Sequence, residues 1–146
     1  MKIGKNDIIK QLKEKIDRKF NIDVCPRTKK NSSQIIFAKG RPMLIPSKLY
    51  KQFEQDCLKQ ITNKYQKKIN YPVNVKALFY MPTRRRVDLT NLLEALDDMF
   101  VKAEVLEDDC RDIIAGHDGS RVYWDKENPH IEVEITEMDN YEQWKE

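Results

Sequence analysis

Residues 73–100 read VNVKALFYMPTRRRVDLTNLLEALDDMF and predict a strand, a basic loop and a helix in succession. Residues 73–81 alternate at first and then become continuously apolar, which is typical of a strand that is increasingly buried. From Leu89 onward, apolar residues recur at helical spacing and predict a helix packed by one face. The opposite side of this helix is expected to carry Thr90, Glu94, Asp97 and Asp98. A strand that leads through a basic loop into an amphipathic helix therefore forms the centre of the predicted fold.

The remaining sequence predicts two more helices and several short strands around this centre. Residues 5–19 place apolar side chains at helical spacing, and Ser47 is positioned to cap a helix that runs to about residue 66. Because short turns join the last three strands, we expect these strands to pair antiparallel. The predicted fold class is α+β, a two-layer mixed sheet with helices packed on it. Strands are predicted at residues 20–24, as a pair within 34–45, and at 110–115, 119–124 and 130–137.

The length and composition predict one cytoplasmic domain with no membrane span and no nucleotide cofactor. The chain has 146 residues, of which 40% are hydrophobic. Its apolar runs fall far short of the roughly 20 residues that cross a bilayer. Its four glycines form neither a GxGxxG nor a GxxxxGK[ST] pattern, the loops that hold dinucleotides and nucleoside triphosphates. Three widely spaced cysteines without a CxxC pair predict reduced thiols rather than disulfides or a zinc site.

Charge divides sharply along the chain at Asp88. Residues 1–87 hold 22 basic and 6 acidic side chains, a net charge of +16, whereas residues 88–146 hold 5 basic and 18 acidic ones, a net charge of −13. A strongly basic half can bind a polyanion while an acidic half gathers metal ions. The alternative is two solvated surfaces of opposite sign that attract each other.

Carboxylates flank the predicted central helix at both ends. Asp88 stands at its start, and Asp109 follows 21 residues later, after Asp108. The helix carries the chain about 22 Å away from Asp88, and the next six residues can return about 20 Å when extended. Asp109 can therefore lie beside Asp88, where two carboxylates form a hard oxygen site suited to Mg²⁺ or Mn²⁺. The alternatives are that Asp88 caps the helix and that Asp108 and Asp109 form a turn.

Basic and aromatic residues around this candidate site suggest how a substrate is held. Residues 84–86 are three arginines that Val87 separates from Asp88, and they are expected to hold a phosphate backbone beside a metal that cleaves a phosphodiester. His117 is a lone histidine between two glycines, and we interpret it as a surface residue. Tyr123 and Trp124 are interpreted as strand packing rather than as base-stacking residues.

Three stretches of the sequence resemble the RusA-type Holliday junction resolvases. They are MPTRRRVDLTNL at residues 81–92, LEDD at 106–109 and IEVEITEM at 131–138. The resemblance covers roughly residues 20–140, and it implies a RusA-like fold and a small dimeric, Mg²⁺-dependent endonuclease of the kind associated with phages and prophages. It divides the chain into an N-terminal amphipathic helical extension (1–19), a nuclease domain (20–140) and an acidic tail (141–146).

The resemblance also implies roles for individual residues. Asp88 matches the first catalytic aspartate of the family's DLDN motif and Asp109 matches the last, and both are implied to be metal ligands, with Asp108 beside them. Thr90 stands where that motif has its second aspartate, and Glu94 stands where the best-known members have a catalytic lysine. Since Glu94 lies one turn beyond Thr90 on the same face, we hypothesise that it restores the missing carboxylate and binds the metal. The implied DNA-binding residues are Arg84, Arg85, Arg86, Lys29, Lys30 and Asn31.

The sequence therefore predicts a metal-dependent, structure-selective endodeoxyribonuclease that resolves four-way DNA junctions by paired nicks in recombination and repair. The expected cofactor is Mg²⁺, with Mn²⁺ as a substitute, and the expected assembly is a symmetric homodimer. Three alternatives stay open. The first is a catalytically weakened or inactive junction-binding protein, and the second is a nuclease for another branched or flapped DNA. The third is an interaction domain whose basic and acidic halves pair between subunits.

Overall fold

A five-stranded mixed sheet forms one layer of the protein. The computed structural model describes residues 4–16, 18–29 and 33–138. The strand order is β1–β7–β4, and β5 and β6 both pair with β4 on its other side, β5 near the start and β6 at the end. β7 runs antiparallel to β1 and β4, whereas β5 and β6 run parallel to β4. The sheet strands are β1 (Lys19–Ile22), β4 (Val73–Met81), β5 (Ile114–Gly116), β6 (Arg121–Trp124) and β7 (His130–Glu137).

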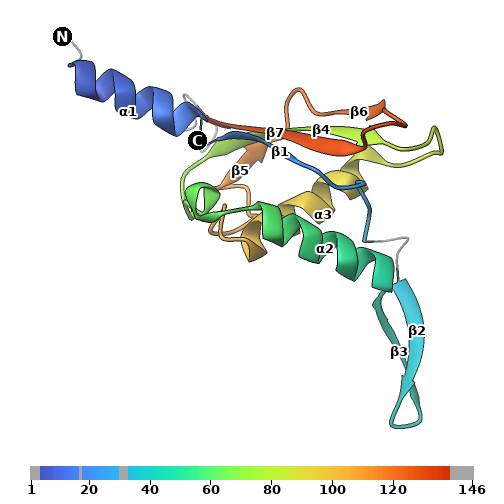
Figure 1. Cartoon of the computed structure of the whole chain (residues 1–146). Helices are drawn as coiled ribbons and strands as arrows, with labels where there is room; N and C mark the ends of the chain where they lie inside the picture. The colour runs from blue at the N-terminus through green and yellow to red at the C-terminus, as the bar shows by residue number, and fades with distance from the viewer. Residues whose placement is uncertain (1–3, 17, 30–32, 139–146) are drawn as a thin grey trace.

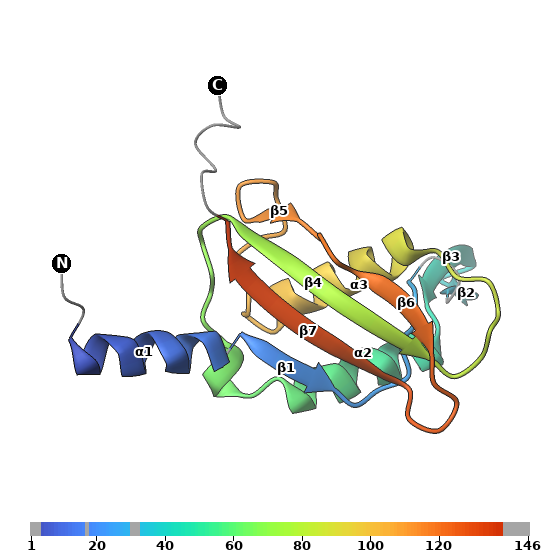
Figure 2. The same cartoon turned by 90° about the horizontal axis from the view of Figure 1, so that it is seen from above.

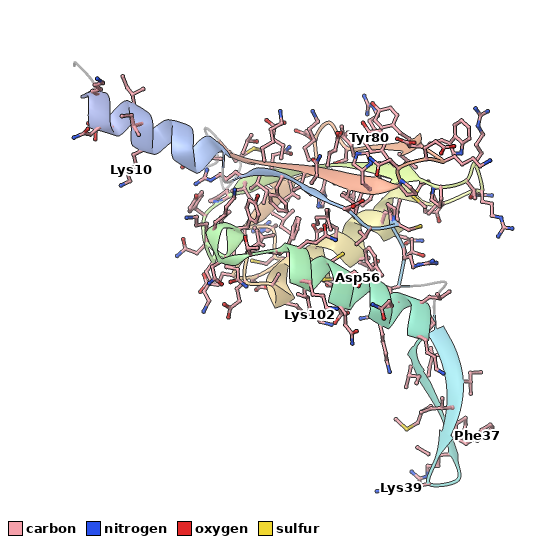
Figure 3. All side chains as sticks on the ribbon, viewed as in Figure 1. Lys10, Phe37, Lys39, Asp56, Tyr80 and Lys102 are labelled. Atoms are coloured by element: carbon pink, nitrogen blue, oxygen red, sulfur yellow. The ribbon has the colours of Figure 1, made fainter. Side chains whose placement is uncertain are left out.

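Two helices form the second layer. Figures 1 and 2 show α2 (Lys48–Gln60) and α3 (Leu89–Lys102) on the same face of the sheet. Every second residue from Val73 to Phe79 in β4 is buried, and the apolar stripe of α3 packs in the same core. Tyr80 lies on the opposite face of the sheet, which carries no helix among the described residues (Figure 3). The prediction of a two-layer α+β fold is confirmed.

The predicted pairing among the last three strands was wrong. β6 and β7 do not pair with each other but lie on opposite sides of β4. The loop after β6 passes over the end of β4, where the Asp125 backbone N–H donates to the Met81 carbonyl over 2.8 Å. A short connection between two strands can therefore cross the end of a third strand instead of forming a hairpin.

Several predicted boundaries also needed correction. The second helix begins as predicted, with the Tyr50 N–H donating to Ser47 Oγ over 3.2 Å, but it ends at Gln60 and is followed by a 3₁₀ turn, η1 (Asn63–Tyr65). The strand predicted at 110–115 is shorter, because Cys110 accepts backbone hydrogen bonds in a turn that precedes β5. The helix predicted within 5–19 is α1 (Lys5–Ile16). No helix in the described ranges is long and apolar enough to span a membrane.

Two elements extend away from the two-layer body. Helix α1 projects from one end, and the hairpin of β2 (Ser33–Ala38) and β3 (Arg41–Pro46) projects near the start of α2 (Figure 1). The predicted turn at Lys39 and Gly40 is present, with both residues at positive φ. Phe37 is 77% exposed on this hairpin (Figure 3). The loop before the hairpin presents Lys29 at the surface, whereas Lys30 and Asn31 lie outside the described residues.

Candidate active site and nucleic-acid interface

The connection from β4 to α3 places Asp88 at the start of the helix. Asp88 occupies the N-cap position, with φ −90° and ψ 123°, but its side chain makes no capping hydrogen bond to the helix backbone. Its exposed carboxylate instead accepts a hydrogen bond of 3.4 Å from Asn91 Nδ2. The Asp88 carboxylate is thus not used to satisfy the free amides of the first turn.

A pocket opens beside α3, on the face of the helix that was predicted to be polar. Residues 90, 93, 94 and 97 line it from the helix because these positions share one helical face. The pocket has a volume of about 270 Å³. We call it the acidic pocket, and its lining consists of Thr90, Leu93, Glu94, Asp97, Asp109 and His117.

Asp108 acts directly on Asp109 in the loop that follows α3. The backbone N–H of Asp109 donates to Asp108 Oδ1 over 2.8 Å, and both residues are exposed. Desolvation, followed by a side-chain hydrogen bond and the negative charge of Asp108, raises the pKa of Asp109 above its ordinary value. A cation bound between the two carboxylates would reduce the repulsion between them.

Two hydrogen-bonded side chains, Asp97 and His117, form part of the lining of the acidic pocket. His117 Nε2 lies 2.9 Å from Asp97 Oδ2 and 3.1 Å from Oδ1, and Asp97 is only 9% exposed. The interpretation of His117 as a simple surface residue was therefore wrong. The helical spacing of Asp97 from Thr90 and Glu94 was a usable signal, but nothing in the sequence linked Asp97 to a histidine 20 residues later. The buried carboxylate fixes the orientation of the imidazole at the pocket wall.

A second, larger recess is lined by the β4–α3 connection and by the last residues of β6. It has a volume of about 520 Å³. The guanidinium carbon of Arg84 lies 4.4 Å from the centroid of the Trp124 ring, within the range of a cation–π interaction. The prediction that Tyr123 and Trp124 are strand packing holds only in part, because they are 45% and 48% exposed. We call this recess the arginine–tryptophan cleft, and its lining includes Arg84, Arg85, Arg86, Val122, Tyr123 and Trp124.

Comparison with protein families places the chain in a known group. The family model of endodeoxyribonuclease RusA matches residues 21–136, well over half of the chain. The chain belongs to the RusA endodeoxyribonuclease family. No match was found among curated proteins. The RusA match contains both the acidic pocket and the arginine–tryptophan cleft, whereas α1 lies outside it.

The structure brings together some of the residues that the RusA resemblance implied. Glu94 and Asp109 both line the acidic pocket, together with Thr90. Asp88 and Asp108 are not part of the lining, although Asp88 precedes Thr90 by two residues and Asp108 bonds Asp109. The arginines at 84–86 lie together in the cleft, and the exposed Lys29 belongs to a different loop.

The donors of the acidic pocket suit a hard divalent cation. Within the described ranges, no group of three or more His, Cys, Asp or Glu side chains is arranged to hold a metal ion. Mg²⁺ nevertheless keeps several waters in proteins and is usually held by one or two carboxylates together with substrate phosphates. Glu94 and Asp109 provide two carboxylates, and Thr90 adds a hydroxyl. A divalent cation held by these groups would take its remaining ligands from water and from a phosphate.

Proposed function

We propose that this protein is a divalent-metal-dependent endonuclease that nicks branched DNA, with the four-way junction as its preferred substrate. The observation that carries the proposal is that the β4–α3 connection lines an arginine-rich cleft and the helix that follows it lines an acidic pocket, in a chain of the RusA family. One region has donors for a metal, and the other has cations for phosphates. Phosphodiester hydrolysis needs both.

Glu94 and Asp109 would hold Mg²⁺ or Mn²⁺ in this proposal, with Asp88 and Asp108 close enough in sequence to act on bound waters. These residues would hold the cation where it could polarise the scissile phosphate and lower the pKa of a bound water. Asp97 holds the His117 ring at the pocket wall through its Nε2 atom, so the position of the imidazole is set before DNA arrives. The arginines 84–86, which line the cleft, would bind the phosphate backbone.

A symmetric homodimer suits the junction. A four-way junction presents two strands related by a twofold axis, so a C2 dimer can place one site on each. Phosphate contacts and the shape of the branch would supply most of the recognition.

A second candidate function is junction binding without cleavage. Two observations favour it: Thr90 offers only a neutral hydroxyl, and no three acidic or imidazole side chains in the described part of the chain converge as a metal site.

The deciding experiment incubates the purified protein with a labelled four-way junction and a matched linear duplex, in Mg²⁺, Mn²⁺ or EDTA. We expect symmetric nicks in the junction that are lost in EDTA and in Asp109→Asn. Asp56→Asn is the matched control, because it makes the same charge change on α2 (Figure 3), where Asp56 accepts a hydrogen bond from Gln52. Junction binding without cleavage in either metal would establish the second candidate. Absence of both would refute the two candidates together.

A further inference from the structure

The arginine–tryptophan cleft contains an aromatic ring that neither the core nor the proposed cleavage chemistry uses. Trp124 ends β6 and is 48% exposed, and its ring is covered by the Arg84 guanidinium at 4.4 Å. Tryptophan side chains are on average highly buried, and their large apolar faces dominate core and interface energetics. A half-exposed indole under a movable guanidinium therefore retains stacking capacity toward a ligand.

The cleft follows the open edge of β6. Successive side chains of a strand point to opposite faces, yet Val122, Tyr123 and Trp124 all line the cleft. A recess that touches three consecutive strand residues must run along the strand edge. β6 pairs with β4 alone among the described residues, so its other edge has no neighbouring strand there. Backbone donors and acceptors at this edge can meet the edge of a flat ligand.

The cations of the cleft have no partners of opposite charge within the described residues. None of the ion pairs found there involves Arg84, Arg85 or Arg86. All three arginines are exposed. Guanidinium groups bind phosphate through paired hydrogen bonds and also stack on flat rings. Free guanidiniums beside an exposed indole match the two parts of a nucleotide, its phosphate and its base.

We propose that the arginine–tryptophan cleft binds an unstacked nucleobase of DNA, with the base on the indole of Trp124 and the flanking phosphates on the arginines. The inference rests on the proposed function and adds a ligand to it, an unpaired nucleotide at the branch point. The cleft volume of about 520 Å³ is within the range of small-molecule sites. The base replaces Arg84 on the ring, and Arg84 moves to a phosphate. Because every base has a flat π face, this contact selects unpaired DNA rather than a sequence.

A polyanion fits this cleft better than a second copy of the chain. An edge strand can also accept a peptide strand. In a twofold contact through this surface, however, both copies would bring three arginines into one interface, because a C2 interface uses the same patch twice, and no carboxylate among the described residues lines the cleft. Like charges placed opposite each other oppose such a contact.

Fluorescence of Trp124 tests the stacking directly and without cleavage. The chain has two tryptophans, Trp124 and Trp144, so Trp144→Phe leaves Trp124 as the only indole. In EDTA, a short thymidine oligonucleotide should quench this emission, and an abasic oligonucleotide of equal length should not. Equal quenching by both oligonucleotides would overturn the proposal. Emission that changes with protein concentration but not with DNA would also overturn it, in favour of a contact between copies.

Binding measurements with substituted proteins provide the second test. We expect Trp124→Leu to weaken binding of the thymidine oligonucleotide roughly tenfold, with no change for the abasic one, and Trp124→Phe to retain most of the affinity. Phe37→Leu is the matched control because it removes an aromatic ring that is 77% exposed on the hairpin, far along the chain from β6. Equal effects of Trp124→Leu on both oligonucleotides, or none on either, would contradict the stacking role.

These tests separate this inference from the proposed function. Junction cleavage combined with base-independent quenching would refute the nucleobase site alone. Base-dependent quenching in a protein that cuts no DNA in any metal would refute the nuclease activity and leave the nucleobase site established.

Discussion

The acidic pocket and the arginine–tryptophan cleft differ in how their charges are held. In and beside the acidic pocket, polar groups interact with one another: Asp97 lies within hydrogen-bond distance of His117, and Asp108 acts on Asp109. In the cleft, three exposed arginines have no carboxylate partner within the described ranges. The first arrangement is fixed before any ligand arrives, whereas the second stays adaptable. Chemistry requires fixed groups, and backbone binding tolerates mobile ones.

The boundary between these regions coincides with the charge boundary of the sequence. Arg86 is the last basic residue of the segment with net charge +16, and Asp88 is the first acidic residue of the segment with net charge −13. In the fold, this point is the entry into α3, with the cleft before it and the acidic pocket after it. The charge boundary of the sequence therefore coincides with the boundary between the two regions. Variants on either side should separate cleavage from binding.

The largest effect is expected from Glu94→Gln in the acidic pocket. Loss of one of the two carboxylates proposed to bind the metal should reduce cleavage at limiting Mg²⁺ by roughly 100-fold, while junction affinity in EDTA stays unchanged. Titration of the cleavage rate with Mg²⁺ measures the first quantity, and fluorescence anisotropy measures the second. Glu127→Gln, an exposed position in the loop after β6, is the control. Unchanged metal dependence and cleavage would show that Glu94 does not replace the carboxylate absent at position 90.

A smaller effect, on junction affinity rather than on cleavage, is expected when the three cleft arginines are replaced by alanine together. At about 0.7 kcal/mol for each exposed ionic contact, junction affinity should fall by roughly 30-fold. The slope of log affinity against log salt should also become less steep by about 2.7, since each phosphate contact contributes about 0.9. Binding isotherms over a range of salt concentrations measure both.

Alanine at Lys5, Lys10 and Lys59 is the matched control for this triple variant. It removes the same charge from α1 and α2, and we expect a smaller change in the salt slope. A slope that changes equally in the two triple variants would show that net charge, and not the cleft, sets the affinity.

The sequence was most informative where local periodicity determines structure. The strand at residues 73–81 is confirmed from its first to its last residue, and the stripe that begins at Leu89 correctly predicted α3. Each of these elements buries one regular face, so the pattern alone specifies it. The polar face of α3 likewise indicated that Thr90 and Glu94 would lie together.

Features that depend on contacts between distant segments could not be predicted. The loop between β6 and β7 has the length of a hairpin loop, and only the position of β4 between the two strands decides that it crosses over. The pair of Asp97 and His117 joins a helix to a turn, and the cleft needs Trp124 of β6 beside Arg84 of the connection. Such contacts carry no periodic signal, because they arise from the topology of the sheet.

The smallest effect is expected from Asp108→Asn, which tests the difference in pH response between the two regions. Arginines stay charged at all working pH values, so the arginines of the cleft contribute no pH response. In the native state the pKa of Asp109 is raised above its ordinary value of 3.8. Between pH 3.8 and this raised pKa, the native state therefore binds more protons than the unfolded chain. Stability contributed by Asp109 is therefore lost as pH rises through this window.

Asp108→Asn removes the hydrogen-bonding carboxylate and its charge, so the pKa of Asp109 should fall toward its ordinary value and this loss of stability should shrink. Thermal unfolding in EDTA, from below pH 3.8 upward, should then show a Tm that declines less with pH than in the unsubstituted protein. The change is small because Asp109 is exposed and solvent screens its repulsion. Asp56→Asn, on α2, should leave the pH profile unaltered. An unaltered profile in Asp108→Asn as well would mean that desolvation alone sets the pKa of Asp109, and the two carboxylates would then not be a strained pair awaiting a cation.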